Sequence, residues 1–220
     1  MEAASSRGAR QSETDVSRLL VLVGGPIASG KSTVSRGSAE RLHAMGVAAA
    51  AIDVDLVYEL LETRGRSPGD PAVWLRAHRL AGSMAAALFA EGVEVVLVEG
   101  DVLGEAACAA LLANAEAHEV RRITLRTSLE AALERVLLDD DRGISRDPAF
   151  LARHYEHAAA TEHRPHDELV LDTDKLTIEE TVAATVAACG SSHGLRSPSR
   201  ATPSPSSSSR SSGCSPTMEA

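Results

Sequence analysis

Short, uniformly apolar runs alternate along the chain with longer segments in which apolar residues recur at helical spacing. The apolar runs predict strands at 19–23, 47–52, 93–98, 122–125 and 168–171. The segments between them predict helices at 31–45, 55–63, 71–90, 104–117, 128–138, 148–160 and 177–188. Because the runs are apolar on both faces, we expect strands covered on both sides. Alternation of strand and helix predicts an α/β domain with a five-stranded parallel sheet.

Both ends of the chain depart from this alternation. Residues 1–17 are polar and lack periodicity, which predicts a flexible leader. Residues 191–220 contain 12 Ser, 4 Pro and 2 Gly, so they cannot bury enough apolar surface to offset the entropy of the chain. We therefore expect a disordered tail at 191–220 and one folded domain over 18–190.

Composition narrows the classes of function and location. The net charge of −9 disfavours a protein that binds mainly the nucleic-acid backbone. No apolar run approaches the ~20 residues that span a bilayer, and the first residues lack the apolar segment of a secretory signal. The three cysteines are odd in number and far apart, so they form neither a disulfide framework nor a CxxC metal pair. These features predict a cytoplasmic protein that acts without a membrane or a nucleic-acid partner.

The strongest chemical signal follows the first predicted strand, where the chain reads GPIASGKST. This matches the P-loop pattern GxxxxGK[ST] and falls at the strand-to-helix junction that the motif requires. The glycines let main-chain N–H groups turn inward, and the following helix adds the positive end of its dipole. Lys31 is one of two lysines in the chain; it would reach the β- and γ-phosphates of ATP, and Ser32 would offer a hydroxyl to Mg²⁺. The predicted nucleotide-binding residues of this loop are Gly25, Pro26, Ile27, Ala28, Ser29, Gly30, Lys31, Ser32 and Thr33.

Acidic residues follow the second and third predicted strands. Asp53 and Asp55 lie two residues apart past the second strand, and Glu99 and Asp101 follow the third. Ligands of open α/β sheets bind beyond the carboxyl ends of strands, so these carboxylates are candidates for one site. One can hold Mg²⁺ or its water shell, and another can accept a proton from an attacking hydroxyl. The simpler alternatives are that Asp53 or Asp55 caps the next helix and that the other two are ordinary strand-end residues.

Arginines surround the connection that follows the helix at 128–138. Arg135 lies on that helix, and Arg142 and Arg146 lie in a polar stretch containing Gly and Pro. A mobile lid with two guanidinium groups could close over ATP and stabilise charge on the transferring phosphoryl group. The alternative is that both arginines pair with the acids at 139–141. The candidate catalytic residues are Lys31, Asp55, Arg142 and Arg146.

These residues resemble the P-loop small-molecule kinases, a group that includes shikimate kinase, adenylylsulfate kinase, gluconate kinase and chloramphenicol phosphotransferase. The resemblance runs from Leu19 to Cys189 and implies a three-layer fold with strand order 2-3-1-4-5 and a short mobile lid. It implies that Asp53 is the metal-side acid and that Asp55 is the base. Ser32 in the loop and Glu99 at the end of the third strand are the other metal candidates, from their positions in the sequence. The resemblance also implies that Arg135 packs on adenine, and that 172–174 lies at the adenine edge.

The resemblance has departures that bear on the acceptor. Shikimate kinase has a glycine-rich triplet after its third strand, where this chain has Glu99-Gly100-Asp101, and the lid lacks the Arg-Pro pair of that family. The chain is most similar to the zeta-toxin and chloramphenicol-phosphotransferase type, which identifies no substrate. Residues 56–82 lie between the second and third predicted strands, where kinases of this group build the acceptor pocket. The single tryptophan of the chain, Trp74, lies in this region; it either stacks on a ring of the acceptor or fills the core, and we prefer the core interpretation.

We therefore expect an ATP- and Mg²⁺-dependent phosphotransferase that acts on a hydroxyl of a metabolite, nucleoside or antibiotic. Two alternatives use the same scaffold: a polynucleotide-end kinase, and a nucleotide-binding regulatory module without acceptor turnover. The expected assembly is a monomer or homodimer. His78, His154 and His157 lie at no metal-ligand spacing, and we expect surface or supporting roles for them.

Overall fold

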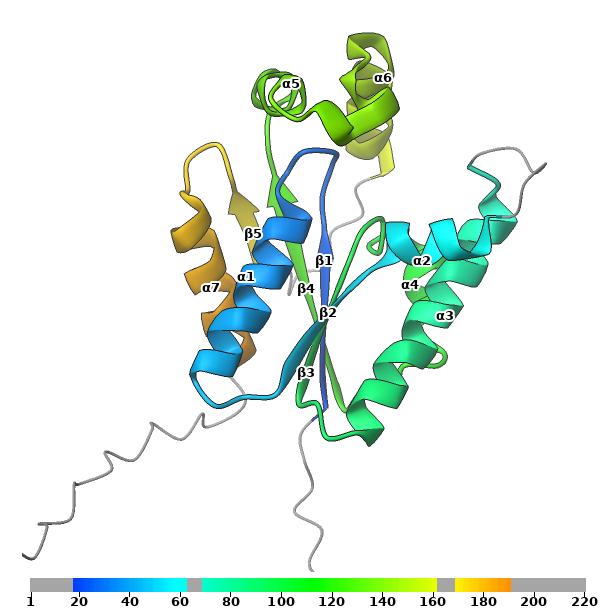
Figure 1. Cartoon of the computed structure of the whole chain (residues 1–220). Coiled ribbons are helices and arrows are strands. Elements are labelled where there is room, and N and C mark those ends of the chain that lie inside the picture. Colours follow the sequence, from blue (N-terminus) through cyan, green and yellow to red (C-terminus); the bar gives the residue numbers. More distant parts are fainter. Residues whose placement is uncertain (1–17, 63–68, 162–168, 191–220) are drawn as a thin grey trace, which may run out of the picture.

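The computed structural model describes residues 18–62, 69–161 and 169–190, with side chains at 140–142 and 159–161 left out. The predicted leader and tail lie outside these residues. The five strands are β1 (Leu19–Gly24), β2 (Ala49–Asp53), β3 (Val95–Glu99), β4 (Glu119–Arg126) and β5 (Leu169–Asp172). They form one parallel sheet in the order β2-β3-β1-β4-β5 (Figure 1), which confirms the expected topology.

Helices cover both faces of this sheet. They are α1 (Lys31–Ala44), α2 (Val54–Leu61), α3 (Pro71–Ala90), α4 (Glu105–Leu112), α5 (Leu129–Leu137), α6 (Pro148–Thr161) and α7 (Ile178–Gly190). In Figure 1, α1 and α7 lie on one face, and α2, α3 and α4 lie on the other. Leu19, Val21 and Val23 pack in the core toward α1 and α7, while Leu20 and Leu22 pack in the core of α3 and α4. Successive side chains of a strand point to opposite faces, which is why an uninterrupted apolar run forms β1.

Several element boundaries differ from those expected. β2 starts at Ala49 rather than at 47, because the Val47 N–H bonds to Leu42 O and closes the end of α1. β4 begins at Glu119, three residues earlier than expected, since it pairs with β1 from that residue onward. α4 ends at Leu112 rather than at 117. Glu116 takes a φ of 50°, a value that does not occur in a right-handed helix, so the helix cannot continue through this residue. Glu99 is the last residue of β3 and not the first residue after it.

The segment expected to be a lid lies over the carboxyl ends of the strands. It is the 3₁₀ segment η1 (Asp140–Arg146), which connects α5 to α6, and Figure 1 draws these two helices at the top of the molecule. The 3₁₀ segment is kinked at Gly143, which takes φ 51° and ψ −128°. A small apolar cluster of Ala28, Ala132, Val136 and Leu151 joins these helices to the loop after β1.

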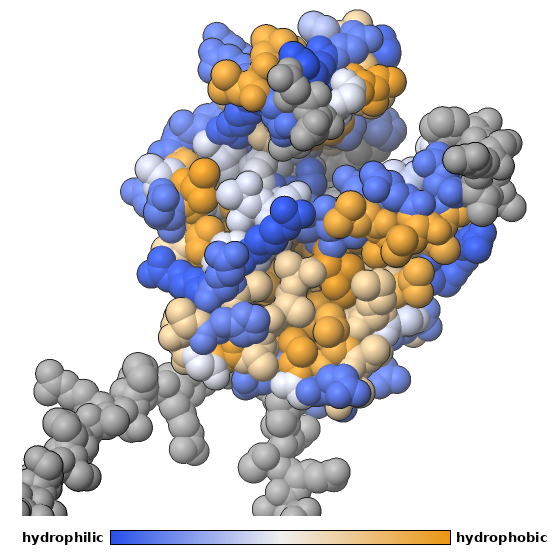
Figure 2. Space-filling view, in the orientation of Figure 1, coloured by the Kyte–Doolittle hydropathy of each residue, from blue (hydrophilic) through white to orange (hydrophobic). Residues whose placement is uncertain are grey.

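The surface adds two observations. Among the described helices, none is both long and apolar enough to cross a membrane. Figure 2 shows apolar surface over the α2–α3 side of the molecule, where the large exposed apolar residues are Leu56, Leu60, Leu80 and Met84. Surfaces of this kind are often used in association, and the expected monomer or homodimer remains a prediction.

Candidate active site

The loop between β1 and α1 follows a path that needs glycine at its start. Gly25 takes φ 146°, and a Cβ added there would lie 2.4 Å from the main-chain oxygen of Leu125 on β4. Gly30 takes φ 92° and immediately precedes α1. Ala28 takes φ 62°, a left-handed backbone conformation that residues other than glycine rarely adopt. The loop therefore turns tightly against β4 before the helix begins.

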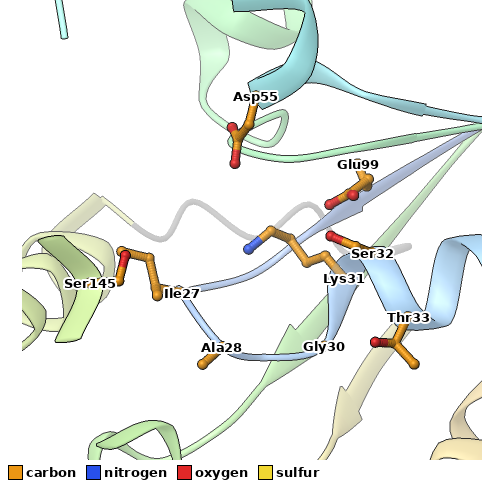
Figure 3. Close-up of a pocket in the computed structure, with 9 residues that line it drawn as sticks. All are labelled: Ile27, Ala28, Gly30, Lys31, Ser32, Thr33, Asp55, Glu99 and Ser145. Atoms are coloured by element: carbon orange, nitrogen blue, oxygen red, sulfur yellow. The ribbon is translucent and has the colours of Figure 1, made fainter. Parts of the chain in front are cut away.

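A cavity of about 130 Å³ lies inside this loop (Figure 3). It is lined by Ile27, Ala28, Gly30, Lys31, Ser32, Thr33, Asp55, Glu99 and Ser145. A water needs about 10–15 Å³ measured in this way, so the space admits several waters or a phosphate group. Lys31 Nζ donates to Gly25 O and to Pro26 O, both at 3.0 Å. Ser29, with 1% of its surface exposed, lies outside the cavity lining and is buried within the loop.

The first turn of α1 faces this cavity, which Lys31, Ser32 and Thr33 line. Asp53, Asp70 and Ser128 cap α2, α3 and α5 with their side chains. Within the described chain, α1 has no such side-chain cap and no acidic residue in its first turn. The N–H groups at a helix N-terminus and the helix dipole together favour an anion at this end.

Two acids and a hydroxyl meet beside Lys31. Asp53 and Glu99 are directly opposite each other in β2 and β3, and Glu99 is only 3% exposed. Burial, the charge of Asp53 and a hydrogen bond with Asp53 raise the pKa of Glu99 to about 7. The hydrogen bond that Ser32 donates to Glu99 and the charge of Lys31 work in the opposite direction. Asp53 also accepts at Oδ1 from the N–H groups of Asp55 and Leu56, so it does cap α2.

Asp55 lies across the cavity from the loop, in the first turn of α2 (Figure 3). Its side chain reaches solvent, but partial burial and the charge of Asp53 raise the pKa of Asp55, whereas the charge of Lys31 lowers it. The charges of Asp101 and Glu59 raise it as well. A carboxylate of this kind, at the mouth of a phosphate-sized cavity, is placed to accept a proton.

Arg135 links the loop to two other strand ends. Its Nη1 donates to Ala28 O, Thr127 Oγ1 and Thr173 Oγ1 at 3.0–3.1 Å, and its Nη2 donates to Thr173 O at 2.8 Å. Asp174 accepts from Arg135, Thr127 and Ser128, so its carboxylate ties the start of α5 to the turn after β5. The edges of the guanidinium are held by these bonds, and 37% of the side chain remains exposed.

The lid segment η1 and the following helix α6 contribute residues to the site that were not predicted. Ser145 of η1 lines the cavity, whereas Arg146 is not among the lining residues, and the side chain of Arg142 lies outside the described structure. His154 and Tyr155 of α6 both bond to the main chain of Ile27. No motif in the sequence indicated this role, because it depends on a contact between residues more than a hundred positions apart.

The predicted acceptor region is partly core. Trp74 stacks on Tyr58 with ring centroids 4.1 Å apart and packs against the core, which confirms the preferred interpretation of this residue. His78 is 2% exposed, with Nδ1 2.7 Å from Trp74 O and Nε2 2.8 Å from Asp101 O. It therefore fixes the turn after β3 to α3. Four arginines of the predicted acceptor region could meet an anionic group. Two of them, Arg76 and Arg79, lie on the exposed face of α3, and the other two, Arg64 and Arg66, lie outside the described residues.

The sequence matches no protein-family model and no curated protein. The fold does match solved structures. A sugar kinase from Janibacter sp. HTCC2649 aligns with a TM-score of 0.58 at 16% identity, over 81% of this chain and 98% of that one. APS kinase of Mycobacterium tuberculosis, in complex with AMPPNP and APS, gives 0.55 at 19%, over 78% and 97%. Shikimate kinase of Bacteroides thetaiotaomicron gives 0.55 at 17%, over 78% and 98%. The chain therefore has the P-loop small-molecule kinase fold.

Proposed function

We propose that the protein transfers the γ-phosphoryl group of ATP, in the presence of Mg²⁺, to a hydroxyl of a small molecule. The observation that carries this proposal is the uncapped start of α1, which opens with Lys31 onto a cavity whose far wall holds Asp55. A phosphate site with a carboxylate opposite it brings a phosphoryl donor and a proton acceptor into one space. The structural neighbours include kinases of sugars, APS and shikimate, which supports the same class of reaction.

The residues beside Lys31 fit a magnesium ion. Ser32, Asp53 and Glu99 present oxygen atoms, which this hard cation prefers, and the repulsion by which the charge of Asp53 raises the pKa of Glu99 would be relieved by a cation. No group of three or more His, Cys, Asp or Glu in residues 18–62, 69–161 and 169–190 could hold a metal alone. This agrees with Mg²⁺, which keeps several waters and phosphate oxygens among its ligands. When bound, the ion would neutralise charge on the phosphate chain.

The nucleoside would lie against Arg135. The hydrogen bonds of Arg135 fix the plane of its guanidinium group and leave part of the side chain exposed, so a flat base could stack on that plane. Because Arg135 also donates to Ala28 O, a base bound there and a phosphate bound in the loop would share one rigid support.

Asp55 would act on the acceptor. Its carboxylate takes the proton of the acceptor hydroxyl as that oxygen bonds to the γ-phosphorus, while the bond from phosphorus to the β,γ-bridging oxygen breaks and ADP leaves. Lys31 stays near the transferring group and offsets its negative charge. The raised pKa of Asp55 suits this task, because a more basic carboxylate accepts a proton more readily.

Two measurements test the proposal in order. Calorimetric titration with Mg·ATP should give binding in the parent protein and much weaker binding in Lys31→Ala, with Lys175→Ala as the matched lysine control. ADP release should then be measured over a panel of sugars, nucleosides, other hydroxyl metabolites and antibiotics, and compared with the acceptor-free rate. Absence of nucleotide binding at millimolar concentration would end the proposal. Transfer to an oligonucleotide end, or binding with no acceptor in any class, would favour one of the two alternative functions.

A further inference from the structure

Both main-chain groups of Ile27 are held by neighbouring residues of α6. The Ile27 N–H donates to His154 Nε2 at 3.3 Å, and the Tyr155 hydroxyl donates to Ile27 O at 2.8 Å. Ile27 itself lines the phosphate cavity. One helix thus fixes the orientation of one residue of the loop from both sides.

The next loop residue is held by α5. Ala28 has the left-handed φ of 62°, and its carbonyl oxygen accepts from Arg135. A residue in such a conformation costs on the order of 1–3 kcal/mol and persists where its surroundings hold it. Ile27 and Ala28 also share the small apolar cluster with Leu151 of α6 and Val136 of α5. The lid segment η1 joins these two helices, so the loop and the lid are supported by the same side chains.

We propose that His154 and Tyr155 are positioning residues that hold the Ile27 peptide, keep the loop in its phosphate-receiving shape and couple that shape to the lid helix α6. The proposal rests on the proposed function only for the identity of the ligand. The contact itself belongs to the free protein, so it can be tested without a nucleotide.

The chemistry of the contact requires a neutral imidazole at His154. Nε2 can accept from the Ile27 N–H only while it carries no proton, so the proton of the neutral ring sits on Nδ1. Burial lowers the pKa of His154 from its ordinary 6.5, the charges of Lys31 and His157 lower it as well, and Asp101 raises it. Lys31 lies on α1, Asp101 follows β3, His157 lies on α6, and the Tyr155 ring contacts His154 edge-on at 6.2 Å. Protonation would set two N–H donors against each other and release the loop.

The first test is amide hydrogen exchange at Ile27 in the nucleotide-free full chain. At position 154, a glutamine would place an acceptor oxygen near the position of His154 Nε2, whereas a leucine would keep a similar volume and could not accept a hydrogen bond. Exchange at Ile27 should be roughly threefold to tenfold faster in His154→Leu and close to the parent rate in His154→Gln. Tyr155→Phe keeps the ring and loses the donor, so it should also speed exchange, and His157→Gln serves as the matched histidine control. Equal exchange in all variants would overturn the proposal.

The second test is Mg·AMPPNP affinity between about pH 5 and about pH 8. Protonation of the nucleotide affects both proteins equally, so it cancels when the affinity of the parent protein is divided by that of His154→Gln. This ratio should fall as the pH drops below 6.5, the ordinary pKa of histidine, because the pKa of His154 lies lower. A ratio that rises on acidification would mean that the imidazolium attracts phosphate directly, and it would overturn the role as acceptor. If no variant binds nucleotide while exchange at Ile27 follows the expected order, the proposed function fails and the loop contact stands.

Discussion

Asp53 and Glu99 occupy opposed positions on β2 and β3, and a hydrogen bond joins their carboxyl groups at the edge of the sheet. Burial and the like charge of Asp53 raise the pKa of Glu99 to about 7, because both make a second ionised carboxylate unfavourable. Ser32 of the phosphate loop donates to the same Glu99. One small region therefore joins the loop, β2 and β3, and it is the region where the proposed magnesium ion would bind.

The first prediction concerns this region. Glu99→Gln can still donate to Asp53 and accept from Ser32, so the fold should persist, but it removes a carboxylate ligand from the proposed metal site. We expect the Mg²⁺ concentration needed for nucleotide binding to rise roughly tenfold to a hundredfold. Calorimetry over a Mg²⁺ series measures this, with the exposed Glu105→Gln as the control. An unchanged Mg²⁺ requirement would exclude Glu99 from the metal site.

The second prediction concerns Asp55. Asp55→Asn keeps the shape of the side chain and removes the proton acceptor, so acceptor-dependent turnover should drop by about 10²–10⁴-fold while the nucleotide dissociation constant stays within a few-fold. Steady-state rates and calorimetry on the same preparation separate the two effects. Glu59→Gln removes another exposed carboxylate of α2 and should leave turnover nearly unchanged. Full activity in Asp55→Asn would remove it as the base.

The third prediction concerns Arg135. Lysine has one ammonium group and cannot bridge Ala28, Thr127 and Thr173 as the guanidinium does. Arg135→Lys should therefore weaken ATP binding by on the order of tenfold and leave inorganic tripolyphosphate binding much less affected. Competition between the two ligands measures the difference. Equal loss for both would show that Arg135 supports the loop and makes no contact with the base.

The fourth prediction separates two causes of glycine preference. Gly46→Ala introduces strain alone, because φ is 83° and no described atom lies within 4 Å of the added Cβ. Gly25→Ala has φ 146° and also brings a Cβ within 2.4 Å of Leu125 O. We expect Gly46→Ala to lower the free energy of unfolding by about 1 kcal/mol, and Gly25→Ala to lower it by roughly 1–3 kcal/mol more. Chemical denaturation measures both, and equal losses would contradict the close approach.

Much of the fold could be predicted from the chain because its signals are local. The apolar run at β1 and the glycines of the next turn identify the strand-to-helix bend, and the spacing to Lys31 identifies the loop. Boundaries were less predictable, since the start of β4 depends on pairing with β1. The capping role of Asp53 was foreseen as an alternative, whereas its contact with Glu99 depends on the register of β2 and β3.

The sequence by itself determined which segments form strands and helices, and where the glycine-containing loop turns between β1 and α1, because backbone conformation and side-chain periodicity act over a few residues. Only the tertiary structure decided which distant groups complete the site. Ile27 and His154 are 127 positions apart, and Arg135 reaches Ala28 over 107 positions. Such contacts depend on how packed helices orient their side chains, and that orientation results from the packing of the whole core rather than from any short pattern.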